Sequence, residues 1–190
     1  MLARLSHLLH KHAKGWPIFV LFLLDAAFMG FILPMAQALM KFDSGGPGPL
    51  DLQFFYTPAN AYEMVAAYGD YGRSFYRNVE LTVDLIYPIV YTLFLSLLIS
   101  WLVERGYSAD SRMRRWNVLP FGAWLFDLLE NIGIVGMLSV FPSTPAVLGV
   151  LTALFTLVKW LFAGASMVVM LVALIAALRN GFRQQAPAGA

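Results

Sequence analysis

The sequence predicts an all-α integral membrane protein, folded as a four-transmembrane-helix bundle with a short amphipathic helix in the first extracytoplasmic loop. The first observation is the composition: 59% of the 190 residues are hydrophobic and 13% are charged. The mean hydropathy is +0.69. Soluble domains carry about 25% charged residues. The second is that four apolar segments reach the roughly 20 residues that a helix needs to cross a bilayer. The third is the uneven placement of Lys and Arg around these segments.

The chain divides into three parts. Residues 1–15 form an arm in which leucines at helical spacing alternate with basic residues, which predicts a cytoplasmic amphipathic helix on the inner membrane surface. Residues 16–180 form the membrane domain. Residues 181–190 include "QQAPAGA" and are expected to be a disordered cytoplasmic tail.

The four spans are expected at residues 16–40, 79–103, 120–141 and 146–178, with an extracytoplasmic loop at 41–78. The fourth is longer than a bilayer requires, so we expect it to be tilted or to project beyond the membrane. Within the loop, "TPANAYEMVAAYG" predicts a short helix. Thr57 is its expected N-cap, Pro58 its first residue and Gly69 its stop signal.

Basic residues indicate the orientation of the chain. They occur in the N-terminal arm, in the connection between spans two and three, and in the tail, whereas the turn "PSTP" between spans three and four has none. The long first loop contains Lys and Arg, but acidic residues offset them. Because Lys and Arg accumulate on the cytoplasmic side, we expect a multi-pass cell-membrane protein with both termini in the cytoplasm.

Several kinds of chemistry are disfavoured. The chain has no cysteine, which excludes disulfides, thiol redox chemistry and cysteine-ligated metals. The three histidines lie in the arm, and we interpret them as solvated interfacial residues, because no cysteine or nearby carboxylate completes a metal site. The sequence contains no nucleotide-binding glycine motif and no hydrolase nucleophile motif. We therefore expect no metal, no cofactor and no nucleic-acid partner.

The stretch "FDLLEN" in the third span carries polar groups into an apolar segment. Asp127, Glu130 and Asn131 are spaced i, i+3 and i+4, so they share one helix face. A charge at mid-membrane costs at least about 2.5 kcal/mol, so such residues normally face the bundle interior and mark a functional site. Two carboxylates this close favour proton handling or an ionic partner. Glu130 is the first candidate for the functional carboxylate because it lies deepest in the span.

The second span and its lead-in show a longer polar pattern. If the helix starts near Asp70, six polar residues fall on one continuous face at steps of three and four: Arg73, Arg77, Glu80, Asp84, Tyr87 and Tyr91. Arg77 and Glu80 are close enough to pair. Pro88 removes the donor for the carbonyl of Asp84, which leaves a kink and an exposed acceptor. This face is interpreted either as the lining of a ligand site or as a polar seam between helices.

The fourth span carries Lys159, the one cation far from a span end, on a face of small and polar residues. We expect Lys159 to pair with a carboxylate, with Glu130 or Asp84 at matching depth. Asp25 in the first span and Asp127 are expected to share the inner half of the membrane.

Three functions fit these patterns. The first is binding of a small or amphiphilic molecule, or membrane lipid, in a polar site between helices, with acid–base chemistry left open. The second is proton- or cation-coupled transport by a homo-oligomer, with Asp127, Glu130 and Lys159 as the relay. The third is a structural or accessory subunit in which the buried charges only fix helix packing.

Overall fold

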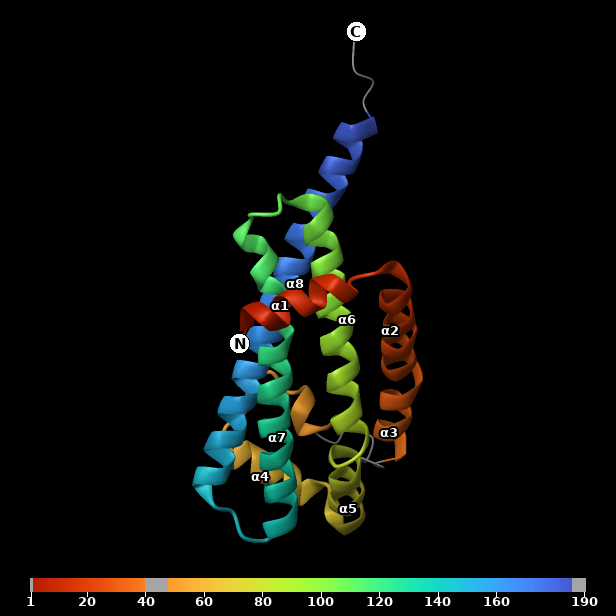
Figure 1. Cartoon of the computed structure of the whole chain (residues 1–190). Coiled ribbons are helices and arrows are strands. Elements are labelled where there is room, and N and C mark those ends of the chain that lie inside the picture. Colours follow the sequence, from red (N-terminus) through yellow and green to blue (C-terminus); the bar gives the residue numbers. More distant parts are fainter. Residues whose placement is uncertain (1, 40–47, 186–190) are drawn as a thin grey trace.

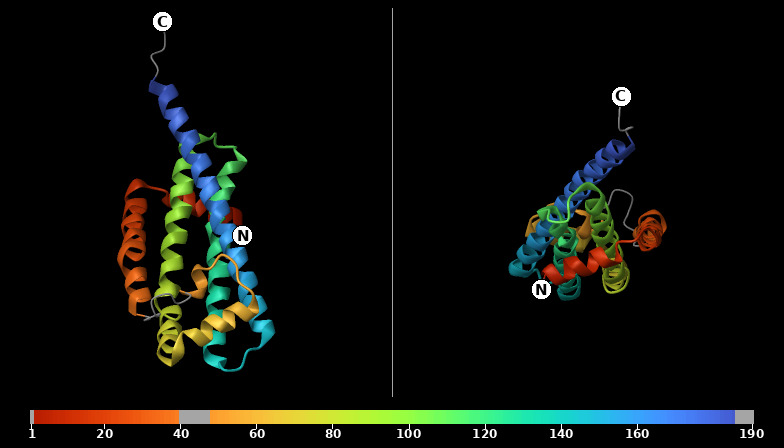
Figure 2. Two further views of the ribbon diagram at one scale, coloured as in Figure 1. Left: turned by 180° about the vertical axis from the view of Figure 1, so that it is seen from behind. Right: turned by 45° about the horizontal axis from the view of Figure 1, so that its top comes forward.

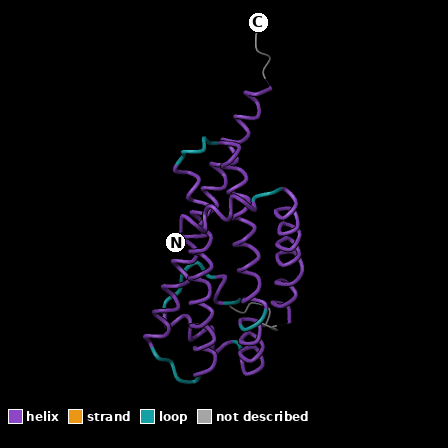
Figure 3. The backbone as a smooth tube through the Cα atoms, in the orientation of Figure 1, coloured by secondary structure: helices purple, strands orange, loops and turns teal. Residues whose placement is uncertain are grey.

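The computed structural model describes residues 2–39 and 48–185, and these residues form helices, turns and loops without strands (Figures 1 and 3). The α-helices, in chain order, are α1 (Leu2–His12), α2 (Gly15–Ala27), α3 (Leu33–Leu39), α4 (Pro58–Ala67), α5 (Gly69–Glu80), α6 (Val83–Gly106), α7 (Pro120–Val140) and α8 (Ala146–Gln185). A π-helical segment, η1 (Phe28–Ile32), joins α2 to α3, and two 3₁₀ segments are η2 (Leu50–Leu52) and η3 (Arg112–Val118). Four helical stretches are long and apolar enough to cross a membrane.

Helices α6, α7 and α8 form the tightly packed part of the molecule. Small residues allow the close approach of α7 and α8. A Cβ added at Gly133 would lie 2.2 Å from Thr152 Oγ1, and one at Gly122 would lie 2.4 Å from the Phe162 ring. Glycine at these positions therefore sets the separation of the two helices.

The first span, α2–η1–α3, stands to one side of this bundle (Figures 1 and 2). It packs chiefly against α6, through ring contacts such as Phe28 on Tyr87 and Phe22 on Phe94. Only 6% of its most apolar 18-residue stretch is buried inside the protein. The π-helical turn widens the helix in the middle of the span, and such turns occur frequently at functional sites.

The second span is not one continuous helix, which corrects the sequence prediction. Helix α5 ends at Glu80 and α6 begins at Val83, with Thr82 in a non-helical conformation (φ −131°, ψ −76°) between them. The predicted Arg77–Glu80 pair is also wrong. Glu80 is fully buried, and neither of its carboxylate oxygens has a hydrogen-bond partner within the described residues.

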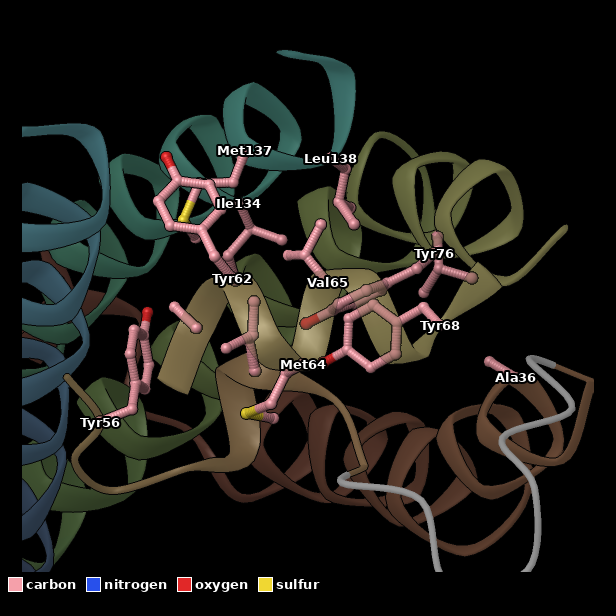
Figure 4. Close-up of a cluster of buried hydrophobic side chains, with 13 residues drawn as sticks. Ala36, Tyr56, Tyr62, Met64, Val65, Tyr68, Tyr76, Ile134, Met137 and Leu138 are labelled. Atoms are coloured by element: carbon pink, nitrogen blue, oxygen red, sulfur yellow. The ribbon is translucent and has the colours of Figure 1, made fainter. Parts of the chain in front are cut away.

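One end of the bundle is capped by α4, α5 and the residues that precede them. The Thr57 hydroxyl oxygen accepts a hydrogen bond from the backbone N–H of Asn60, and Pro58 occupies the first turn of α4. Val65, Tyr68 and Tyr76 gather with Ile134 of α7 in a buried cluster (Figure 4). Residues 48–56 fold back along α8 in this region. The loop expected at 41–78 is therefore largely packed against the bundle in its described part, and residues 40–47 lie outside the described residues.

The opposite end is closed by α1, which crosses α6 (Figure 1) and packs on α6 and η3. Leu9 is buried against Ile18 and Leu97. His10 is not a solvated histidine as predicted. Its Nδ1 lies 3.0 Å from a Glu104 carboxylate oxygen and its Nε2 lies 3.0 Å from the Arg114 carbonyl oxygen, which ties the arm to the protein.

Helix α8 is longer than predicted. It begins at Ala146 as expected but continues to Gln185 and projects beyond the other helices (Figure 2). Residues 181–185 are therefore helical, contrary to the expectation of disorder. Residues 186–190 of the predicted tail lie outside the described residues.

Candidate functional site

A cavity of about 470 Å³ lies between the first span and the α6–α8 bundle. Its walls come from α2, η1, α3, α5, α6, α7, α8 and residues 49–52. Following α6 along its length divides its part of the lining in two. Asp84, Tyr87 and Tyr91 come first on α6, and Phe94, Leu95 and Leu98 follow them. Helix α8 repeats this order, with polar groups toward the α4 end and apolar groups toward the α1 end.

Lys159 is the centre of the polar part. Its Nζ forms an ion pair with Glu130 and lies 3.4 Å from Asp127 Oδ1. It also donates a 3.0 Å hydrogen bond to the carbonyl oxygen of Asp51. The prediction that Lys159 pairs with a carboxylate is confirmed, with Glu130 as the partner rather than Asp84. Pairing offsets part of the cost of burying these charges.

Two further contacts hold α6 against α7. The Tyr91 hydroxyl donates to Asp127 Oδ2 at 3.1 Å. The Asn131 amide donates to the carbonyl oxygen of Asp84 at 2.9 Å. This carbonyl is the acceptor that Pro88 was predicted to leave without a donor, so the expected free acceptor exists and a side chain of the third span satisfies it.

The Glu130 carboxylate is held from a second side. Thr156 donates to Glu130 Oε1 at 2.6 Å, and Tyr56 lies 2.9 Å from the Thr156 hydroxyl. Burial, followed by the nearby Glu130 charge, raises the pKa of the Tyr56 phenol above its usual value, so Tyr56 remains a neutral hydrogen-bonding group. A chain of contacts therefore runs from Tyr56 through Thr156 and Glu130 to Lys159.

Two carboxylates near this network are not paired. The Asp84 carboxylate lines the cavity and has no hydrogen bond or ion pair within the described residues. Glu80 is fully buried, and neither of its carboxylate oxygens has a hydrogen-bond partner within the described residues. Asp25 lines the cavity from the first span, close to the Tyr87 hydroxyl. Among the described lining residues, four aspartates therefore face one cation, Lys159.

The structure brings together most of the candidate residues but separates them by role. Seven line the cavity: Asp25, Asp84, Tyr87, Tyr91, Asp127, Asn131 and Lys159. Glu80 and Glu130 do not line the cavity and are completely buried. Arg73 and Arg77 do not line the cavity. Arg73 pairs with Asp70 and stacks over the Phe141 ring, where it braces the end of the bundle.

Sequence reasoning missed Asp51, Tyr56, Tyr76 and Trp160. Tyr76 donates to the Asp51 carboxylate, and Trp160 donates to the Gln53 carbonyl oxygen at 3.2 Å. The only local signal was the apolar and aromatic character of "LDLQFFY" in a segment interpreted as an external loop. A loop this apolar indicates burial, but its contact with the fourth span is not encoded locally.

No family model, curated protein or solved structure matches the chain. Within residues 2–39 and 48–185, no group of three or more His, Cys, Asp or Glu side chains is arranged to hold a metal ion. What the site offers is a hydrogen-bonding, acidic region continuous with an apolar region, in a volume typical of small-molecule pockets.

Proposed function

We propose that the chain is a multi-pass membrane protein that binds a small or amphiphilic molecule in the cavity between its first span and the α6–α8 bundle. The observation that carries this proposal is the two-part lining of the 470 Å³ cavity. Polar side chains at one end suit a head group, and the side chains of Phe94, Leu98 and Met167 at the other suit a hydrocarbon tail. Any acid–base chemistry would fall to the cavity-facing carboxylates, Asp84 and Asp127.

Insertion in a membrane is part of the proposal. Large apolar side chains on the outer faces of the four long helices are exposed, among them Phe31, Ile132 and Val147, as expected where lipid replaces water. The α1 arm and the η3 connection, which carry many of the basic residues, lie at one end, and α4 lies at the other (Figure 1). This arrangement supports cytoplasmic termini and an external α4.

The orientation is tested by cysteine labelling, because the native chain has no cysteine. A Ser143→Cys variant places a thiol in the α7–α8 turn and should react with an impermeant maleimide from outside the cell. A Ser108→Cys variant, in the α6–η3 connection, should react only after the membrane is opened. The reverse pattern would invert the proposed orientation.

Ligand binding is tested by filling the cavity. Ala163 lines the apolar part, so Ala163→Phe places a ring in the ligand's space. Ala165→Phe is the matched control, because Ala165 is exposed on another face of α8 and does not line the cavity. Mass spectrometry of the purified protein should find a retained molecule with the wild type and the control, and a much reduced amount with Ala163→Phe. Equal retention by both variants, or none by the wild type, would overturn the proposal.

Proton-coupled transport is a second candidate, favoured by the unpaired Asp84 and Glu80 next to the ion-paired Asp127 and Glu130. It requires a homo-oligomer, because four membrane-spanning helices are few for a transporter that works as a monomer. A pH-dependent flux in liposomes that Asp84→Asn abolishes would support it.

A structural or accessory role is the third candidate, favoured by the position of Glu130. Thr156 and Lys159 hold this carboxylate, and it does not line the cavity. In the binding proposal, Glu130 therefore positions Lys159 rather than contacting ligand. Loss of assembly with a partner on neutralising Glu130, without any bound small molecule, would favour the accessory role.

A further inference from the structure

We infer that the cavity selects a cationic amphiphile, one with a protonated amine head group and a hydrocarbon tail. This inference rests on the proposed binding function and specifies its ligand chemistry. Three observations carry it: three protein oxygens already surround the Lys159 ammonium, the Asp84 carboxylate has no donor within the described residues, and carboxylates outnumber cations among the described lining residues.

The surroundings of Lys159 disfavour an anionic head group. An ammonium has three N–H donors, and three oxygens surround the Lys159 nitrogen: those of Glu130, Asp127 and the Asp51 carbonyl. An anion that approached Lys159 would have to displace one of these oxygens and would meet two carboxylates. Lys159, the only cation among the lining residues that the structure describes, therefore serves the protein rather than a ligand.

The other polar groups of the cavity mostly accept hydrogen bonds. The Asn131 side-chain amide already donates to the Asp84 carbonyl oxygen, and the Tyr91 hydroxyl already donates to the Asp127 carboxylate. The side chain of Asp84 remains without a donor within the described residues, and Asp25 faces the same space from the first span. A ligand that satisfies the Asp84 carboxylate must bring donors.

Glu80 supports the same conclusion independently. Its carboxylate is fully buried, and both oxygens lack a hydrogen-bond partner in the described structure. Asp51, Asp84 and Tyr76 are its neighbours. Burying a carboxylate without a partner is unfavourable, so a positive head group near Asp84 would compensate for charge that the protein itself leaves unbalanced.

The apolar end defines the rest of the molecule. Phe94, Leu98, Met167 and Met170 line it, and methionine side chains adapt to tails of different shape. The wall formed by the first span is thinly packed, and Met29 and Leu33 of η1 and α3 face the cavity. A molecule arriving from the lipid phase would meet this wall first.

The test compares three probes of equal chain length: hexylamine, 1-hexanol and hexanoate. Saturable binding of each is measured by equilibrium dialysis on the full chain in lipid nanodiscs at neutral pH, with empty nanodiscs as background. We expect hexylamine to bind at least about tenfold more tightly than 1-hexanol, and hexanoate to bind no better than background, since tenfold corresponds to one strong charged contact. Asp84→Asn should reduce hexylamine binding about tenfold and leave 1-hexanol within twofold. Asp110→Asn, an exposed carboxylate outside this cavity, should change neither.

The outcomes separate the inference from the function on which it rests. Saturable binding of amine and alcohol with equal affinity would keep the cavity as a binding site and reject the cationic head group. Preference for hexanoate, or amine binding that Asp84→Asn does not weaken, would reject it as well. Binding of none of the probes above background would overturn both the inference and the proposed cavity function for molecules of this size.

Discussion

The first span and the α6–α8 bundle differ in how they are held. The bundle is joined by buried hydrogen bonds and ion pairs between helices, with glycines that allow α7 and α8 to touch. The first span rests on α6 mainly through side-chain packing, and most of its apolar surface faces outward. Yet both regions contribute to one cavity, with Lys159 on the rigid side and Asp25 on the loose side.

This difference indicates a division of labour. Regions with few buried contacts are the ones that open at low free-energy cost, whereas buried hydrogen bonds and ion pairs between helices make a region rigid. We therefore expect the α6–α8 bundle to define the position of the polar groups and the first span to act as the movable wall. Substitutions in the two regions should have correspondingly unequal effects on stability.

The largest effect is expected from Lys159→Met. It leaves Glu130 and Asp127 buried without their cation, which typically costs about 3–5 kcal/mol. Thermal unfolding in detergent, followed by circular dichroism, should show a large fall in midpoint or loss of folded protein. Adding Glu130→Gln should recover part of the loss, because one of the stranded charges is removed. A Lys159→Met variant as stable as the wild type would mean that the network does not hold the bundle together.

A smaller loss is expected from Thr156→Val, which removes the donor to Glu130 while keeping the shape of the side chain. A hydrogen bond to a charged group is worth about 1.5–3 kcal/mol. Thr144→Val, at an exposed threonine in the α7–α8 turn, is the control and should leave the unfolding midpoint unchanged. Equal midpoints for the two variants would show that the Thr156–Glu130 contact contributes nothing.

Glycine substitutions compare the two regions directly. Gly133→Ala places a methyl group 2.2 Å from Thr152 Oγ1, and overpacking of this kind costs about 1–3 kcal/mol. Gly30→Ala, in the π-helical segment, meets no other described atom within 4 Å and should be neutral or slightly stabilising. Unfolding midpoints of the pair measure the contrast, and a larger loss at Gly30 would reverse our assignment of the rigid and loose regions.

The smallest effect is expected from Leu23→Ala in the first span. Leu23 is 51% exposed on the outer side, so its truncation should change the free energy of unfolding by less than about 0.5 kcal/mol. Ile134→Ala, at a fully buried residue of α7, should cost about 2–5 kcal/mol by comparison. Similar losses of unfolding free energy for the two variants would indicate that another molecule, such as a second copy of the chain, covers the outer side of the first span.

Local patterns in the sequence account for much of this architecture. Spacing of three and four places Asp127, Glu130 and Asn131 on one face, and the structure confirms that this face meets α6 and α8. Pairing of Lys159 followed from its isolation as a cation within an apolar span. These inferences succeed because helical periodicity is a local property and an unpaired buried charge is costly.

Other features depend on contacts between distant segments and were not predictable in the same way. Asp51 and Tyr56 reach α8 across about a hundred residues, and nothing near either residue encodes that partner. The break at Thr82 interrupts a face that periodicity alone continued from Arg73 to Tyr91. The cavity itself is a space between helices, so it depends on their relative placement and not on any one of them.

The most direct test of the binding cavity is an experimental structure of the full chain in lipid nanodiscs, at a resolution that shows non-protein density. We predict elongated density between the first span and α6–α8, with one end within hydrogen-bonding distance of Asp84 and the other against Met167. A structure in which the first span closes onto α6 and protein side chains fill this space, without density for a bound molecule, would contradict the account.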